Sequence, residues 1–126
     1  MTQPVYIAFE GPEACGKSTQ AQRLAESIGA VLTRETGGTD IGAQLRSILH
    51  DVDTVGLDDH AETLIVAADR AQHLAEVVRP ALERGEHVVS DRSVYSSLAY
   101  QGYGRGLPVD DVRRINEWAI GSTWPD

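Results

Sequence analysis

A short glycine-rich segment with a lysine and a hydroxyl group follows the first apolar run of the chain. Residues 11–18 read GPEACGKS and fit the pattern G-x-x-x-x-G-K-[ST] in full. Glycines let a backbone wrap closely around a polyphosphate with its N–H groups pointing inward. A helix that begins at the end of the loop adds the positive end of its dipole. The segment therefore predicts a loop that holds a nucleoside triphosphate.

The polar residues of this loop have separate predicted tasks. Lys17 supplies a mobile charge for the β- and γ-phosphates, and Ser18 offers its hydroxyl to Mg²⁺. The carboxylate of Glu13 is unusual in a phosphate cradle, and we expect it to face Mg²⁺ or a hydroxyl of the acceptor. A plain glycine turn is the alternative, but the lysine, the hydroxyl and the strand–loop–helix context disfavour it. The predicted nucleotide-binding residues are Gly11, Pro12, Glu13, Ala14, Cys15, Gly16, Lys17, Ser18 and Thr19.

A carboxylate and a guanidinium end the third apolar segment, where HVVS is followed by Asp91 and Arg92. Open α/β sheets bind ligands at the carboxyl ends of their strands. A kinase that brings two phosphorylated molecules together needs cations aimed at both. We therefore predict that Arg92 is catalytic and that Asp91 belongs to the ligand site. The alternative is that Asp91 caps a helix and Arg92 is a surface charge.

Two other classes of phosphate-loop protein fit the sequence less well. A switch GTPase needs D-x-x-G after a strand and a later N-K-x-D. Residues 53–56 read DTVG, but the residues before them are not a convincing strand and no N-K-x-D follows. A motor-type ATPase needs an acidic residue that closes an apolar strand, which Asp91 supplies. The arginines near it favour a kinase instead.

The elements that position these residues alternate between strands and helices. Strands are expected over residues 5–9, 30–35 and 86–91, because these runs are short, apolar and rich in β-branched residues. Helices are expected over residues 17–28, 41–49, 58–83, 93–101 and 108–121. This order predicts parallel βαβ units in a three-layer α/β fold.

The longest helical segment, residues 58–83, carries an apolar face and one arginine beside it. Its predicted core residues are Leu64, Ala67, Ala68, Ala71, Leu74, Ala75, Val78 and Leu82, and Pro80 should kink or break the helix. Val66 and Arg70 are one turn apart at the border of this face. Together they would line a ligand cleft, unless Arg70 only extends its stem along the apolar surface toward water.

Composition limits the remaining classes. The chain has 126 residues, enough for one domain over residues 1–126, with 41% hydrophobic and 24% charged residues. The net charge of −8 disfavours nucleic-acid and membrane-surface partners, which select a basic face. The one cysteine excludes an internal disulfide, and no basic leader segment is visible, so we expect a cytoplasmic protein.

Taken together, these segments resemble the bacterial type of the thymidylate kinase family. The resemblance rests on the phosphate loop with TRETGGT, AADR, DRS and SSLAYQG, and covers nearly the whole chain. It implies transfer of the γ-phosphate of ATP to dTMP with Mg²⁺, in a phosphate-loop NTPase fold. Arg92 would clasp the dTMP phosphate, and Arg70 would reach the thymine edge. The remaining implied contacts are Ser97 and Gln101 at the base, Tyr100 near the sugar, Glu13 at the acceptor, and Glu35 and Asp91 as metal or water-shell carboxylates.

The chain also departs from the family pattern. Thr36 stands where the family usually has proline, Val66 where it has a phenylalanine that stacks on thymine, and Ala14 where glycine or arginine is common. The resemblance places an arginine-bearing lid and two more strands beyond residue 126. It thus implies an amino-terminal part of a kinase that is dimeric at full length, with its first strand unpaired on one side.

Because of the missing lid, we expect residues 1–126 alone not to catalyse phosphoryl transfer. Two alternatives to a dTMP kinase remain at this stage. One is a kinase for another nucleotide or deoxynucleotide, since Val66 weakens the case for thymine. The other is an inactive module that binds nucleotide or dimerises.

Overall fold

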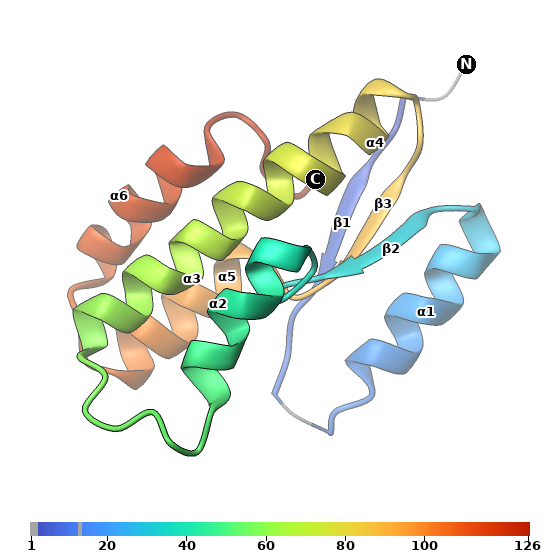
Figure 1. Ribbon diagram of the computed structural model, residues 1–126. Helices are drawn as coiled ribbons and strands as arrows, with labels where there is room; N and C mark the ends of the chain where they lie inside the picture. The colour runs from blue at the N-terminus through green and yellow to red at the C-terminus, as the bar shows by residue number, and fades with distance from the viewer. Residues whose placement is uncertain (1–2, 13) are drawn as a thin grey trace.

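The computed structural model describes residues 3–12 and 14–126, and its helices lie on both faces of a small parallel sheet (Figure 1). One helix, α1 (Lys17–Ile28), covers one face. The other face is covered by a long helical run and the helices that follow it. This is the three-layer α/β arrangement that the alternating elements predict.

The strands are β1 (Tyr6–Phe9), β2 (Val31–Arg34) and β3 (Val88–Asp91). They pair in parallel in the order β1-β3-β2, so β3 is central. Phe9 and Arg34 are both level with Asp91. The carboxyl ends of all three strands therefore meet at one edge of the sheet, and Asp91 lies at this edge.

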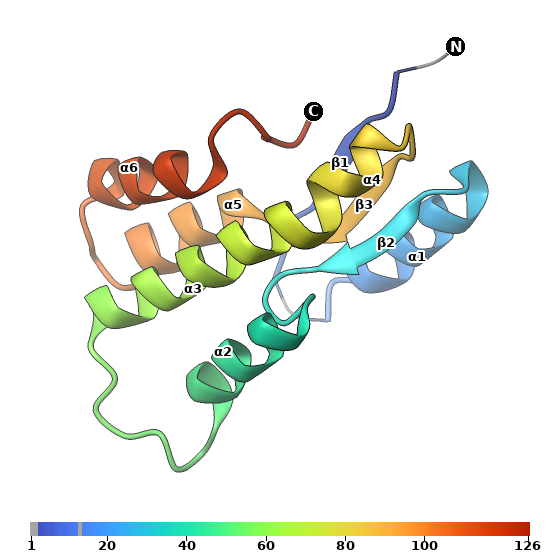
Figure 2. The ribbon, with the colours of Figure 1, turned by 45° about the horizontal axis from the view of Figure 1, so that its top comes forward.

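The remaining elements are helical and follow in chain order. They are α2 (Asp40–His50), α3 (Asp59–His73), the π-helix η1 (Leu74–Val78), α4 (Arg79–Glu83), α5 (Val94–Ser97), the π-helix η2 (Leu98–Gly104) and α6 (Val109–Ile120). Figure 2 shows α2 and α6 on either side of α3, with α5 between α6 and α3.

The core is divided by the sheet into two clusters, because neighbouring residues of a strand point to opposite faces. On the α1 side, Ala21 and Ala25 pack against Val89. On the other side, Val88 packs with residues from β1, η1, α4, α5 and α6. These are Tyr6, Leu74, Val78, Ala81, Val94 and Ile120.

The long helical run differs from its sequence-based description in two ways. It does not break at Pro80: the run continues to Glu83, and a wider π-turn precedes the proline, with the Arg79 N–H donating to the Leu74 carbonyl. A proline cannot donate to the preceding turn, and the run leaves α-helical geometry just before it. Its predicted core face is also only partly buried, since Leu64 is 55% exposed.

The buried side of α3 is more polar than the apolar pattern indicates. It consists of Thr63, Val66, Ala67, Asp69, Arg70 and His73. Ala68 and Ala75, expected in the core, are exposed instead. The burial of Asp69, Arg70 and His73 on this side has a structural cause, because each of them hydrogen-bonds to residues of neighbouring segments.

The free edge of β1 is met by the last residue of the chain. The Asp126 N–H donates to the Tyr6 carbonyl at 2.7 Å, and the Tyr6 N–H donates to the Asp126 carboxylate at 2.9 Å. The expectation of an unpaired first strand is therefore wrong at Tyr6. Over residues 3–12 and 14–126, no helix combines the length and apolar character needed to cross a membrane.

Candidate active site

A cavity of about 690 Å³ opens at the carboxyl edge of the sheet. Its walls come from the start of α1, the ends of β2 and β3, α3, α5 and η2. This volume lies within the usual range for small-molecule sites. Ten of the predicted site residues line it: Lys17, Ser18, Glu35, Val66, Arg70, Asp91, Arg92, Ser97, Tyr100 and Gln101.

The phosphate loop, residues 11–18, has the backbone geometry that its glycines permit. Gly16 has a φ of 89°, which glycine adopts readily, and α1 begins at the next residue. A Cβ atom on Gly11 would come within 2.8 Å of the Cys15 sulfur. Ala14 has a φ of 60°, an uncommon value for a residue with a side chain, at the position where the family pattern often has glycine. Glu13 lies outside the described residues.

Lys17 and Ser18 both contact the carboxylate at the end of β3. The Lys17 Nζ lies 2.8 Å from Asp91 Oδ1, and the Ser18 hydroxyl donates to Asp91 Oδ2 at 2.5 Å. Burial by itself raises the pKa of Asp91, but the hydrogen bonds from Lys17 and Ser18 outweigh it and hold that pKa below its ordinary value. The alternative that Asp91 caps a helix is wrong, because Ser93 occupies the N-cap position of α5.

Arg92 is held in a strained backbone conformation beside this carboxylate. Its φ is 74°, a value that costs free energy for a residue other than glycine. Its Nη1 lies 3.3 Å from the Ser96 hydroxyl and 3.3 Å from the Tyr100 hydroxyl. The guanidinium carbon lies 5.2 Å from the centre of the Tyr100 ring, so the cation also rests against an aromatic face. The guanidinium is thereby directed at the cavity, not at bulk solvent.

Glu10, which the sequence analysis missed, fixes the backbone after Arg92. One of its carboxylate oxygens accepts the Ser93 N–H at 2.7 Å, and the other accepts the Ser96 hydroxyl. Burial raises the pKa of Glu10. The only signal for Glu10 in the sequence was its position between β1 and the first glycine of the phosphate loop.

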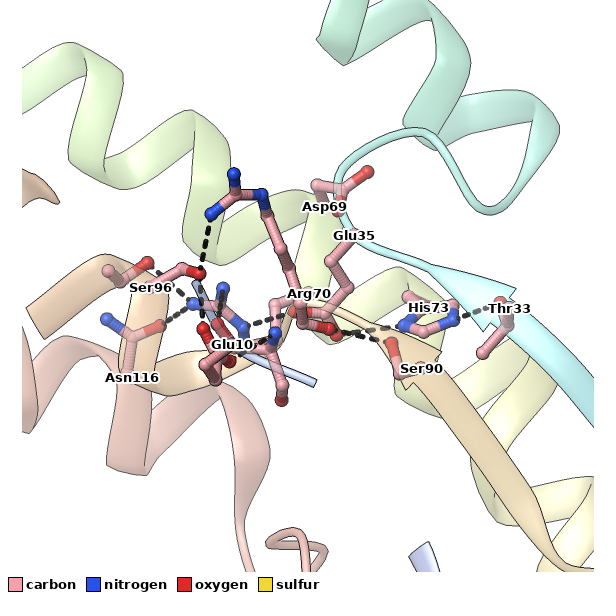
Figure 3. Close-up of polar contacts among 12 residues, drawn as sticks. Glu10, Thr33, Glu35, Asp69, Arg70, His73, Ser90, Ser96 and Asn116 are labelled. Atoms are coloured by element: carbon pink, nitrogen blue, oxygen red, sulfur yellow. Dashed lines mark hydrogen bonds and ion pairs between the residues drawn. The ribbon is translucent and has the colours of Figure 1, made fainter. Parts of the chain in front are cut away.

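Behind the cavity lies the buried arginine network, which we define as Arg70 with Glu35, His73, Ser97 and Asn116 (Figure 3). Arg70 is 2% exposed. Its guanidinium donates to Glu35 Oε1 at 2.7 Å, Ser97 Oγ at 2.8 Å and Asn116 Oδ1 at 2.5 Å. It also donates to the Ser93 carbonyl at 3.0 Å. The interpretation of Arg70 as a cation that extends to water is therefore wrong.

These four hydrogen bonds use four of the five N–H groups of a guanidinium. Arg70 also lines the cavity. The remaining N–H is therefore available to a ligand, and the other four set the plane of the group.

Glu35 takes a different place from the one the resemblance implies. Its side chain is 1% exposed, and its second oxygen accepts a hydrogen bond from His73 Nδ1 at 2.8 Å. Burial by itself raises the pKa of Glu35, but the charge of Arg70 and the His73 hydrogen bond outweigh it and keep the pKa low. With both oxygens engaged, its carboxylate orients Arg70 and His73. The expectation of a metal or water-shell carboxylate is corrected accordingly.

The residue before Arg70 holds the loop that follows β2. Asp69 Oδ1 accepts the Gly37 N–H at 2.9 Å, and burial raises the pKa of Asp69. A Cβ atom on Gly38 would collide with the Arg34 carbonyl, and one on Gly42 would collide with Asp69. Gly38 in this loop and Gly42 in the first turn of α2 therefore have no room for a side chain.

Other charged residues of the cavity were not predicted. Arg34 and Arg46 add positive charge to its wall, and Glu62 and Arg105 lie at the α3–η2 side. Arg46 donates to the Thr36 carbonyl at 3.1 Å. The sequence did not predict this contact, because it depends on how α2 packs against the loop after β2, and not on the spacing of ten residues. Within the described ranges, no group of three or more His, Cys, Asp or Glu side chains could hold a metal ion by itself.

Comparisons with known proteins all lead to one family. The family model described as thymidylate kinase matches residues 9–126. The thymidylate kinases of Halothermothrix orenii and Bacillus velezensis are each 48% identical to the chain over 97% of its length. The match covers 61% and 60% of those two proteins, so the chain spans about three fifths of their length.

A solved structure shows the same fold. The crystal structure of thymidylate kinase from Ehrlichia chaffeensis superposes with a TM-score of 0.92 at 35% sequence identity. The superposition covers 99% of this chain and 74% of the solved one. The likeness therefore extends over all elements described above.

Proposed function

The chain belongs to the thymidylate kinase family, and from that premise we propose that the protein transfers the γ-phosphoryl group of ATP to dTMP. One observation carries the proposal: a single cavity contains the phosphate-loop lysine on one side and two arginines, Arg70 and Arg92, on the other. A phosphate oxygen of dTMP attacks the γ-phosphorus of ATP, and the bond to the β-phosphate oxygen breaks. The products are dTDP and ADP, and no other reactant is needed.

The phosphate-loop side binds ATP in this proposal. The first N–H groups of α1 lack partners within the helix and are open to phosphate oxygens. Lys17 balances charge on the γ-phosphate. Because its ammonium pairs with Asp91 at 2.8 Å, it must exchange that contact for the phosphate when ATP binds.

The opposite side binds dTMP. Arg92 pairs with the acceptor phosphate, where a bidentate guanidinium–phosphate contact fixes the position of the attacking oxygen. Arg34 and Arg46 line the same cavity and add to its positive charge. The free N–H of Arg70 donates to the thymine edge, with Ser97 and Gln101 at the base and Tyr100 at the sugar.

Mg²⁺ fits the residues present. Ser18 Oγ and the Asp91 carboxylate lie together at the foot of the cavity, and proteins usually hold Mg²⁺ through one or two oxygen ligands plus substrate phosphates. Bound there, Mg²⁺ would neutralise charge on the transferring phosphoryl group. We propose that the reaction takes place in the cytoplasm.

We also propose that the protein forms a homodimer through α3 and α6. An apolar groove of about 410 Å³ runs between them, and it contains Leu64 at 55% and Trp118 at 89% exposure. A contiguous apolar patch of this kind is unusual on a monomer surface. The variant Trp118→Lys should shift the mass measured by light scattering from dimer to monomer, and an unchanged dimer would exclude this surface.

Catalysis is tested with a chimera that joins residues 1–126 to the remaining part of the Halothermothrix orenii relative. Initial rates are measured with ATP and with dTMP, dUMP, dGMP or AMP as acceptor, and the unaltered relative serves as control. We expect dTDP formation at about 1 s⁻¹ or faster, with the highest kcat/KM for dTMP. An inactive chimera beside an active control, or a preference for another acceptor, would refute the proposal.

A further inference from the structure

A glutamate on α3 holds the side-chain amide of Gln101. Gln101 belongs to η2, is 8% exposed, and donates through Nε2 to Glu62 Oε1 at 3.1 Å. Both residues line the cavity. The two side chains come from segments 39 residues apart and meet only because η2 packs against α3.

The contact determines which way the amide faces. An ionised carboxylate only accepts hydrogen bonds, so the NH₂ group of Gln101 must point at Glu62. The carbonyl oxygen then lies on the opposite side of the planar amide. No group in the described part of the chain donates a hydrogen bond to that oxygen. With its NH₂ group held by Glu62, Gln101 presents its carbonyl oxygen as an acceptor for whatever occupies the cavity.

An arginine holds the Glu62 carboxylate in place. Arg105 Nη2 donates to Glu62 Oε2 at 3.0 Å, and Arg105 Nε donates to Glu62 Oε1 at 3.3 Å. The Glu62 side chain is 17% exposed and that of Arg105 is 53% exposed. The two parallel contacts fix the carboxylate plane, which leaves Oε1 directed at Gln101.

We propose that Glu62 is a specificity-determining positioning residue, which locks the Gln101 amide so that the site accepts a pyrimidine with a hydrogen on N3 and rejects cytosine. The proposal rests on the acceptor being a nucleotide, as proposed above. Thymine has an N3–H that matches the Gln101 oxygen, and a neighbouring carbonyl that matches the free N–H of Arg70. Cytosine carries a lone pair at N3 and an amino group beside it, so both contacts are mismatched. A site built to hydrogen-bond one pattern rejects the other strongly, because its buried polar groups are left unpaired.

The test measures the affinities of dTMP and dCMP for the 126-residue chain by isothermal titration calorimetry. In the variant Glu62→Gln, the partner of Gln101 can either accept or donate, so the Gln101 amide is free to flip. We expect the ratio of the two affinities to fall by about tenfold. The matched control is Glu76→Gln, since Glu76 accepts from Gln72 Nε2 at 2.9 Å on the exposed side of the same helical run. The control should leave the ratio unchanged.

A double variant separates positioning from folding. Glu62→Gln with Gln101→Glu exchanges donor and acceptor within the pair, and residue 101 again presents only an acceptor to the base. We expect this variant to recover the dTMP preference to within about threefold of the original chain, by the same affinity scale.

An unchanged ratio in Glu62→Gln, an equal loss of both affinities, or no recovery in the double variant would overturn the role of Glu62. If Glu62→Gln fails to fold, the double variant decides alone. If the unaltered chain shows no preference for dTMP, the acceptor assignment itself is refuted and this inference falls with it.

Discussion

The two sides of the cavity differ in how their polar groups are held. On the phosphate-loop side, Lys17, Ser18 and Asp91 form contacts with one another near the surface, and the cradle is backbone. On the acceptor side, the buried arginine network joins three helices, α3, α5 and α6, to the loop after β2, and Arg70 is 2% exposed. One side must exchange its internal contacts for a ligand, while the other already has its donors fixed.

This difference indicates how the two substrates are recognised. A triphosphate is recognised mainly by charge, which tolerates some rearrangement of a flexible lysine. A nucleobase is recognised by the direction of hydrogen bonds, which requires side chains that cannot turn. Burial raises the effective strength of such hydrogen bonds, and it also makes each unsatisfied partner costly.

The variant Glu35→Gln should destabilise the protein by about 3–5 kcal/mol, because it leaves the buried charge of Arg70 without a counter-charge. The measurement is chemical denaturation followed by circular dichroism. The control is Glu86→Gln, since Arg84 Nε and Glu86 Oε1 are also 2.7 Å apart but both side chains are exposed. It should have no measurable effect. Equal losses of unfolding free energy in the two variants would show that burial does not make the ion pair of the acceptor side more important than an exposed pair.

The variant Lys17→Ala should lower kcat of the chimera by roughly 10²-fold, because it removes one charge that stabilises the transferring phosphoryl group. Its free energy of unfolding should stay close to that of the parent, since Asp91 is the only ion-pair partner of Lys17 among the described residues. Arg23→Ala, on the exposed side of the same helix, provides the control. Activity within threefold of the parent would remove Lys17 from the mechanism.

The variant Arg92→Lys should raise the KM for dTMP by about tenfold while the KM for ATP changes little. A bidentate guanidinium contact becomes a single point contact, and the two groups are not interchangeable at such a site. Steady-state kinetics with each substrate varied in turn give both constants. Parallel changes in the two KM values would assign Arg92 to the fold and not to the acceptor.

The smallest effects concern pH, and they have opposite signs at two carboxylates. The pKa of Asp91 is lowered from 3.8, so its contribution to stability is present above pH 3.8 and is lost as pH falls through the folded-state pKa. The pKa of Glu10 is raised from 4.5 by burial, so stability falls as pH rises from 4.5 through the folded-state pKa. The measurement is thermal melting between pH 3 and 7. Asp91→Asn should remove the pH dependence of stability that Asp91 contributes, and Glu10→Gln should remove the one that Glu10 contributes. Identical profiles in both variants would contradict these assignments.

The phosphate-loop side was readable from the sequence because its requirements are local. Gly16 needs a positive φ, and Lys17 and Ser18 follow it directly on α1. The parallel pairing and the position of Asp91 at a strand end also followed, since parallel strands place their carboxyl ends at one edge.

The acceptor side was only partly readable, because its contacts join distant residues. Arg70 was placed near a cleft by helical periodicity, but its partner Asn116 lies 46 residues later and gave no signal. Periodicity assigns polar residues to solvent, so Asp69 and His73 were missed on the buried side of α3, while Leu64 was placed in the core and is exposed. The π-helical turn of η2, which presents Gln101, has no distinctive pattern either.

Amide hydrogen exchange, measured by mass spectrometry on the 126-residue chain, tests the contrast between the two sides most directly. Local stability should be high where buried contacts are many and low where the backbone is exposed. We expect slow exchange over residues 66–74 in the free protein, with little change when dTMP is added. Residues 11–19 should exchange fast and become protected only with ATP and Mg²⁺. Fast exchange around Arg70 until dTMP is added would contradict the claim that the acceptor side is formed in advance.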